Sequence, residues 1–290
     1  MKKLIPLFAF LSFGYNASAQ LLWKITGNGI DNPSYILGTH HFCTGEFCDS
    51  IPGFYDAYAS VERVTCEMDM LEVASLAPET SAKISSYMVL PEEVTFSSLF
   101  DEKELPRIDS FLKTHLGVGV EYIQNLKPVT VMVNIQNIIL RKMLPEITTQ
   151  SGIDTFVQEL ARKDGKSVSG LESIDYQMSI LYETPLKTQA KEFLEFIGED
   201  DIVEEARVLT EAYKNKDLKR LGRYTKEGLD KERYRKIVKE RNCRWVEQMK
   251  QSLSEVPTLY AVGAGHLPGK DGVINLLRKA GYNVEPVTTK

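Results

Sequence analysis

The chain has 290 residues, 43% of them hydrophobic and 26% charged, with a formal net charge of −5 at neutral pH. A chain of this length and composition can bury a substantial core, as one large domain or as one domain that carries an insertion. Its acidic balance argues against a nucleic-acid partner, because phosphates favour a strongly basic protein face.

Residues 1–19 have the pattern of a secretory signal peptide. Two lysines precede an apolar stretch, Leu4–Phe13, that is too short to span a bilayer, and the sequence A-S-A at 17–19 is typical of a cleavage site. We therefore expect an exported protein that occupies residues 20–290 as a single domain and has no transmembrane helix. The pattern leaves open whether export ends in a periplasm or outside the cell.

The first elements expected after this leader are two strands, at Leu21–Thr26 and Ser34–Leu37. The turn-forming sequence G-N-G at 27–29 joins them. A short helix is expected at Ile51–Ser60, and a third strand, rich in β-branched residues, at Arg63–Met68.

The middle of the chain, about residues 71–250, is predicted to be mainly helical because its apolar residues recur at helical spacing. It includes a helix at Gly152–Lys163 and a strand at Ser167–Glu172. The chain then closes with three elements: a strand at Thr258–Val262, a helix at Asp271–Ala280 and a strand at Tyr282–Val287. This order predicts an α/β fold, in which a central mixed sheet built from N- and C-terminal strands carries a long helical insertion.

Two strand-to-loop corners share one pattern. The sequence Y-I-L-G-T-H-H at 35–41 aligns with Y-A-V-G-A-G-H at 260–266, so each strand leads into Gly-x-x-His. A glycine permits a sharp turn and the close approach of a ligand, and residues beyond strand ends commonly form the sites of α/β sheets. Because neutral imidazole is a common ligand of divalent metals, we predict that His41 and His266 bind one metal ion. For either corner alone, an ordinary turn with a surface histidine is the alternative.

A catalytic metal needs at least one donor beyond these two histidines. Glu67 lies at the end of the third strand and is the first candidate, and Glu172 lies at the end of the next strand and would be a general base or a further ligand. Either glutamate can also be a solvated residue at a strand terminus. His40 is expected to pack or to support the site, because neighbours in an extended segment point to opposite sides.

The sequence E-R-N-C-R-W at 240–245 ends a long basic helix, most of whose charges we expect to face solvent. Arg241 and Asn242 differ because they lie shortly before the strand that leads to the second histidine. An arginine there could stabilise a developing oxyanion or hold a substrate carboxylate.

Cys43 and Cys48 lie close to the first histidine and could form a small disulfide loop in an oxidising compartment. Two thiols and a Cys-x4-Cys metal pair are the alternatives, although the chain offers no second pair of that kind. The pattern does not decide whether Cys66 and Cys243 are paired.

Several stretches carry a family resemblance. They are L-L-W-K-I-T-G at 21–27, S-Y-I-L-G-T-H-H at 34–41, G-L-E-S-I-D-Y-Q at 170–177, E-R-N-C-R-W at 240–245, and G-A-G-H-L-P-G-K-D-G-V-I-N-L-L-R-K-A-G-Y at 263–282. They resemble the TraB/PrgY/GumN family, to which the Tiki metalloproteases also belong. The resemblance runs from about Leu21 to Val287 and is most specific at the two ends.

The resemblance implies a fold similar to the erythromycin-esterase and ChaN type, an α/β core with helical insertions. The Cys43 and Cys48 pair departs from the family pattern. The family's motif positions map onto Gly38, His41, Glu67, Glu172, Gln177, Arg241, Asn242, Gly263 and His266.

We therefore predict an exported metal-dependent hydrolase that acts on peptides or proteins. His41, Glu67 and His266 would hold a manganese, cobalt or zinc ion that activates water. Glu172 would be the general base and Arg241 would stabilise the oxyanion. The supporting residues would be Gly38, His40, Gln177, Asn242 and Gly263.

Two alternatives stay open. Erythromycin-esterase-like relatives suggest a metal-independent hydrolase, in which histidine and glutamate act as acid and base on an ester. ChaN-like relatives suggest haem binding, and TraB relatives suggest inhibition of a peptide pheromone, in both cases without catalysis. The sequence does not indicate an oligomeric state.

Overall fold

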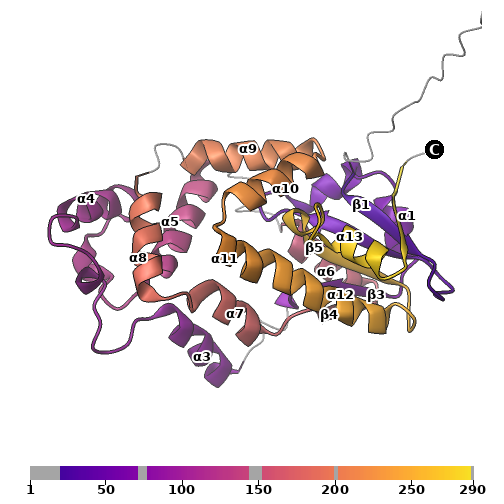
Figure 1. The fold of residues 1–290 in the computed structure, drawn as a ribbon, viewed down its shortest axis with the longest axis horizontal. Coiled ribbons are helices and arrows are strands. Elements are labelled where there is room, and N and C mark those ends of the chain that lie inside the picture. The colour runs from indigo at the N-terminus through magenta and orange to yellow at the C-terminus, as the bar shows by residue number, and fades with distance from the viewer. Residues whose placement is uncertain (1–19, 71–76, 144–151, 199–201, 289–290) are drawn as a thin grey trace, which may run out of the picture.

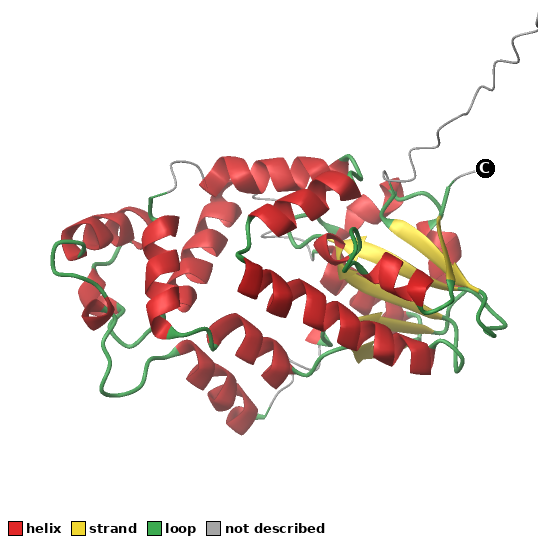
Figure 2. Ribbon diagram, in the orientation of Figure 1, coloured by secondary structure: helices red, strands yellow, loops and turns green. Residues whose placement is uncertain are grey.

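The computed structural model describes residues 20–70, 77–143, 152–198 and 202–288. Their six-stranded sheet lies toward one end of an elongated molecule, and a group of helices forms the other end (Figure 1, Figure 2). The predicted signal peptide, residues 1–19, lies outside the described residues and stays a prediction.

The sheet combines strands from both ends of the chain. Across the sheet the order is β4 (Ser167–Gly170), β3 (Arg63–Cys66), β5 (Thr258–Gly263), β2 (Ser34–Thr39), β1 (Leu22–Thr26) and β6 (Asn283–Pro286). The strands from β4 to β2 are mutually parallel, whereas β1 runs antiparallel to both of its neighbours. The predicted α/β class with a mixed central sheet is therefore confirmed.

The helices lie mainly between β3 and β5 in the chain. They are α1 (Phe54–Ala59), α3 (Pro78–Met88), α4 (Leu105–Leu116), α5 (Pro128–Met143), α6 (Ile153–Lys163), α7 (Ile174–Tyr182), α8 (Leu186–Phe196), α9 (Ile202–Lys214), α10 (Leu218–Glu227), α11 (Lys231–Tyr234), α12 (Arg241–Ser252) and α13 (Val273–Lys279). A π-helical segment, Arg235–Glu240, joins α11 to α12. Among the described residues, no helix is both long enough and apolar enough to cross a membrane.

Two hydrophobic cores stabilise the sheet and the helices. The larger one surrounds the sheet and buries side chains of every long strand, among them Leu37 and Val262. The second lies within the helical end, where Ile108 of α4, Ile135 of α5 and Phe193 of α8 are fully buried. The helical insertion therefore has an apolar core of its own, as its helical spacing of apolar residues requires.

The two predicted corners lie side by side because β2 and β5 pair in parallel, with Gly38 opposite Val262 and Thr39 opposite Gly263. Both strands run further than predicted, since β2 ends at Thr39 and β5 at Gly263. Each glycine thus lies within its strand, and the turn begins after it.

Gly38 has no room for a side chain. A Cβ atom there would lie 2.8 Å from Leu267 Cδ1 and 3.1 Å from Ala264 Cβ. The loop after β5 therefore packs directly on the backbone of β2, and this close approach requires glycine.

The disulfide that the sequence left as one possibility for Cys43 and Cys48 is not formed. Cys43 and Cys48 are both thiols buried in the core around the sheet, Cys43 just before the short 3₁₀ helix Gly45–Ser50 and Cys48 within it. Hydrogen bonding holds the segment instead, since Ile153 N donates to Cys43 O at 3.0 Å. Burial raises the pKa of the Cys48 thiol to about 12, which makes it unreactive at neutral pH.

We expect Gly38→Ala to lower the free energy of unfolding by about 1–3 kcal/mol, because it overpacks the contact between β2 and the loop after β5. Leu267→Ala should cost less in the Gly38→Ala background than in the wild type, with a coupling of at least ~0.5 kcal/mol. Denaturant unfolding of the four proteins in this cycle measures the coupling. Strictly additive losses would show that the two residues do not contact each other.

Candidate functional site

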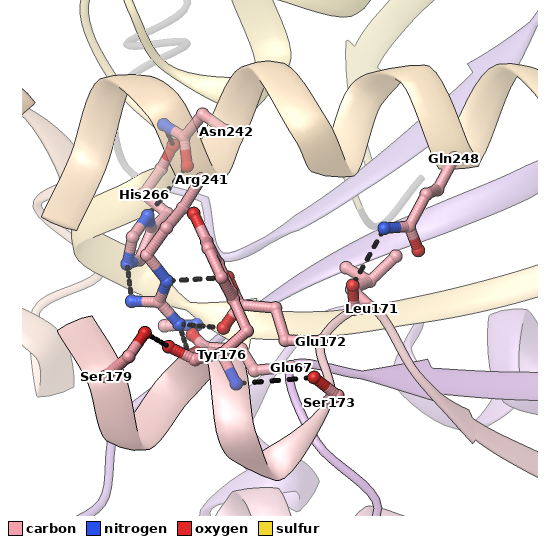
Figure 3. A network of polar contacts seen from close by, with 11 residues as sticks. Glu67, Leu171, Glu172, Ser173, Tyr176, Ser179, Arg241, Asn242, Gln248 and His266 are labelled. Atoms are coloured by element: carbon pink, nitrogen blue, oxygen red, sulfur yellow. Dashed lines mark hydrogen bonds and ion pairs between the residues drawn. The ribbon is translucent and has the colours of Figure 1, made fainter. Parts of the chain in front are cut away.

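The candidate site lies beyond the carboxyl ends of the parallel strands, where the sites of α/β sheets are commonly found. Glu67 is the first residue after β3, and Glu172 lies two residues beyond β4. His266 follows β5, and Arg241 opens α12, whose first turn lies at this end of the sheet (Figure 3).

Arg241 joins the two glutamates. Its Nε donates to Glu172 Oε1 at 2.8 Å, and its Nη2 donates to Glu172 Oε2 and to Glu67 Oε2, both at 2.7 Å (Figure 3). The pair with Glu172 is bidentate, the strongest geometry that an arginine and a carboxylate can adopt. The Arg241 side chain is 7% exposed and that of Glu172 only 1%, so water screens this pair little.

Glu67 is held as a carboxylate. Its Oε1 accepts a hydrogen bond from Gly263 N at 2.8 Å, at the end of β5. Burial alone would raise the pKa of Glu67, but the charge of Arg241 and the hydrogen bond from Gly263 N–H outweigh burial, so the pKa lies below its usual value. Burial lowers the pKa of His266 to about 4, so that ring is neutral at pH 7. Arg241 and Gly263 are therefore the groups that lower the pKa of Glu67.

His266 is buried and fixed on both ring nitrogens. Its Nε2 lies 3.3 Å from Arg241 Nη1 and its Nδ1 lies 2.7 Å from Asn242 Oδ1. An arginine can only donate, so we assign the proton to Nδ1, which donates to Asn242, while Nε2 accepts from Arg241. The ring also packs against Trp245 in a tilted arrangement, at 4.5 Å between centroids.

Asn242 anchors the loop that carries His266. Its Nδ2 donates to the backbone oxygens of His266 at 3.1 Å and of Asp271 at 2.8 Å. With its side-chain oxygen on the His266 ring, Asn242 therefore holds both the ring and its backbone in place.

His41, by contrast, projects toward solvent and pairs with an aspartate. Its side chain is 75% exposed, and its Nδ1 lies 2.9 Å from Asp154 Oδ2. The other Asp154 oxygen accepts a hydrogen bond from the Thr39 hydroxyl. The charge of Asp154, and then its hydrogen bond, raise the pKa of His41 to about 9.

Asp154 is the site residue that the sequence did not reveal. Gly152 pairs with Thr44 in an isolated bridge, which places the first turn of α6, and with it Asp154, beside the loop that contains His41. The only local signal was an acidic residue in the first turn of a helix, which is common at helix N-termini and does not indicate a site.

A cavity of about 310 Å³ opens between these groups. Its polar walls are His41, Glu67, Asp154, Gln158, Gln177 and Arg241, and its apolar walls include Met68, Met70, Ile180 and Leu181. The two predicted corners therefore contribute unequally, because His41 faces this cavity whereas His266 lies behind Arg241 and is not part of its wall.

Two of the predicted supporting residues, Gln177 and His40, lie in different surroundings from each other. Gln177 lines the cavity. His40 is half-buried beside the sheet, with its ring edge-on to Tyr213 at 5.1 Å and Phe42 at 5.3 Å. Burial lowers the pKa of His40 to about 4, so it is a neutral packing group at pH 7.

The described arrangement does not fit the predicted metal ion. Within residues 20–70, 77–143, 152–198 and 202–288, no three histidine, cysteine, aspartate or glutamate side chains are grouped so that they could hold one. Both oxygens of Glu67 already accept hydrogen bonds, and His266 Nε2 accepts from a cation. These are the donor atoms that a metal would use, so the metal site stays a prediction.

The fold and site define an α/β protein with a polar cavity beyond the carboxyl ends of its parallel strands. The sequence model of the TraB/PrgY/gumN family matches residues 21–286, and the chain therefore belongs to this family. No curated protein and no solved structure matched the chain in the corresponding comparisons.

We expect Arg241→Met to destabilise the fold by about 3–5 kcal/mol, because it leaves buried carboxylates without their cation. The loss should be smaller at about pH 5 than at about pH 8. In the wild type, the stabilisation that comes from the low pKa of Glu67 is present above its ordinary value of 4.5 and is lost as the pH falls. Without Arg241 that pKa rises, so Glu67 takes up a proton, and sheds its charge, at a higher pH.

Arg162→Met is the matched control, since Arg162 pairs with Asp69 but its side chain is 36% exposed. Breaking that more exposed pair should cost no more than about 1 kcal/mol. Chemical denaturation at the two pH values measures both variants. Equal losses, or a loss at Arg241 that does not change with pH, would contradict the buried network.

Proposed function

We propose that this protein is a hydrolase that works by acid–base catalysis, with His41 as the group that transfers protons and Asp154 as its partner. The observation that supports this most directly is the contact of 2.9 Å between His41 Nδ1 and Asp154 Oδ2 at the wall of a polar cavity. This is the metal-independent alternative indicated by the sequence, with an aspartate in place of the expected glutamate.

Asp154 fixes the state of the imidazole. Its carboxylate accepts a hydrogen bond from His41 Nδ1–H, which leaves Nε2 to exchange a proton with water or substrate. The Thr39 hydroxyl holds the second carboxylate oxygen and so limits the rotation of Asp154. Neutral His41 would take a proton from water as the water oxygen attacks a carbonyl carbon, and the imidazolium would return that proton to the leaving group.

Arg241 would stabilise the oxyanion that forms on the carbonyl oxygen. Its Nε and Nη2 are bound to glutamates, and Nη1 contacts His266, but Nη1 keeps one further N–H while Arg241 lines the cavity. A preorganised donor of this kind typically contributes about 2.7–4 kcal/mol to the transition state.

Glu172 receives a different role from the one that its sequence position predicts. Both of its oxygens accept hydrogen bonds from Arg241, and its side chain is 1% exposed. A base must reach the proton that it removes. We therefore assign Glu172 the positioning of Arg241, and we assign the proton transfer to His41.

The walls of the cavity support an acyl substrate with an apolar group beside its carbonyl. Met68, Met70, Ile180 and Leu181 form one part of the cavity, and the charged groups form another. About 310 Å³ lies at the lower end of the range for small-molecule sites, which suits a single side chain or a short acyl group. Both an ester and a peptide bond satisfy this description.

A metal-dependent peptidase is the second candidate. His41, Glu67 and Asp154 line the same cavity, although no three such side chains of the described residues are grouped around one metal position. This reading requires Glu67 to exchange its contact with Arg241 for a metal ion.

The catalytic role of His41 predicts a distinctive pH profile. With p-nitrophenyl esters and fluorogenic peptides as substrates, kcat/KM should rise with pH through about 9, because only the deprotonated imidazole accepts a proton. Asp154→Asn removes the charge that raises the pKa, so the rise should move toward the ordinary value of 6.5, with a lower plateau. His41→Ala should lower kcat/KM by about 10²- to 10⁴-fold.

His115→Ala provides the control, since His115 lies on α4, in the helical end, and packs against Phe111. Its activity and pH profile should match those of the wild type. An active His41→Ala protein, or an unchanged profile in Asp154→Asn, would exclude His41 as the proton-transfer group.

Metal removal separates the two candidates. We expect dialysis against a strong chelator to leave kcat/KM unchanged, because the proposed groups need no ion. Measured activity that disappears on chelation and returns with manganese or cobalt would favour the metal-dependent peptidase instead.

A further inference from the structure

A second cavity lies away from the candidate site. Its volume is about 850 Å³, and it is bounded by α10, α13, the loop 267–270 and Trp23 of β1. No residue of its wall belongs to the smaller cavity around His41. In Figure 1, α10 and α13 lie over the sheet end of the molecule.

The floor of this cavity is apolar. Trp23, Leu218, Leu267 and Ile274 line it, and all four are buried. The indole of Trp23 also lies 5.5 Å from the guanidinium of Arg278. The floor thus offers a surface on which an apolar body of moderate size can pack.

The rim of the cavity is strongly basic. Five cationic side chains line it, against the single acidic side chain of Glu227; they are Lys219, Arg223, Lys226, Lys270 and Arg278. None of the five forms an ion pair with another residue of the described chain. Arg207 and Lys236, on neighbouring helical segments, do pair with glutamates.

These five cations gather on one rim of a chain whose formal net charge is −5, and Arg278 among them also donates to Val284 O. Like charges on one rim repel each other, and clustered cations around a concave surface create a local positive potential. An anion bound among them would relieve the repulsion.

Glycines bring the walls of this cavity together. A Cβ atom on Gly222 of α10 would lie 2.5 Å from Pro268 Cγ, and one on Gly265 would lie 2.5 Å from Thr225 Oγ1. The loop after β5 therefore packs directly against α10, and the two surfaces are held in one arrangement. A preformed wall lowers the entropic cost of binding a ligand.

We propose that this cavity binds a small amphipathic anion, with its apolar body on the floor around Trp23 and its carboxylate, sulfate or phosphate head on the cationic rim. The volume lies within the range of small-molecule sites. Burial of the apolar body contributes about 25 cal/mol for each Å² removed from water, and the rim selects the sign of the head group. This proposal is independent of the hydrolase proposal.

Titration of residues 20–290 with dodecanoate below its micelle concentration tests the proposal through tryptophan fluorescence. The chain has two tryptophans, Trp23 in this cavity and Trp245 beside His266. We expect a saturable change in emission that Trp23→Phe largely removes. A competing probe, 1-anilinonaphthalene-8-sulfonate, should be displaced by dodecanoate with the same affinity.

The double variant Lys219→Glu plus Arg223→Glu should raise the Kd for dodecanoate at least about 10-fold, because both exposed side chains belong to the rim. The matched control is Lys142→Glu plus Lys163→Glu, which makes the same change of net charge at exposed positions outside the cavity. The control should bind as the wild type does. Circular dichroism confirms that both double variants are folded.

Several results would overturn the proposal. They are the absence of saturable binding, equal weakening in the two double variants, and equal affinity for dodecanoate and for uncharged dodecanol or cationic dodecyltrimethylammonium. Binding to vesicles of anionic lipid without binding to monomeric dodecanoate would also overturn it, in favour of a membrane-surface patch.

Discussion

The arrangement of the candidate site depends on a single buried guanidinium. Arg241 binds Glu172 through two hydrogen bonds and Glu67 through a third, so one cation ties the ends of β3 and β4 to α12. Glu67 in turn accepts from Gly263 N and connects the end of β5 to the same network. Removing such charges from water is costly unless every partner is in place. The π-helical segment just before Arg241 is consistent with a site, since π-helical turns are frequent at functional positions.

Two corners with the same sequence pattern have different surroundings because different elements pack against them. His266 lies in a short 3₁₀ turn beneath α12, where Asn242, Arg241 and Trp245 enclose its ring. His41 lies in an open turn, where its ion pair among the described residues is with Asp154 from the start of α6. A buried neutral ring that accepts from an arginine suits positioning, and an exposed ring paired with a carboxylate suits proton transfer. The repeated pattern describes the strands and their glycines, and it does not determine the chemistry.

The sequence indicated the fold and much of the site through local features. Alternating turn signals and apolar runs predicted the strands, and the positions of Glu67 and Glu172 after strand ends predicted that they would meet. The role of Asp154 could not be predicted in this way, because it depends on the bridge between Thr44 and Gly152, residues more than one hundred positions apart. The position of Arg241 between the predicted ligands could not be predicted either. It depends on how α12 packs against the sheet, which no local sequence pattern indicates.

The loop after β5 lines the larger cavity and reaches the smaller one only indirectly, through the contact of His266 with Arg241. On its inner side, Asn242 holds the backbone at His266 and Asp271, and on its outer side Gly222 and Gly265 let α10 press on it. Leu267 and Lys270 face the larger cavity, directly after the residue whose ring accepts a hydrogen bond from Arg241. A ligand that favours one position of this loop would act on Arg241 only through its contact with His266, which at 3.3 Å is the longest of the four. Two sites are coupled only as far as a ligand at one site changes the free energy of binding at the other. The bidentate bond to Glu172 holds Arg241 independently of this loop. The two cavities should therefore be only weakly coupled.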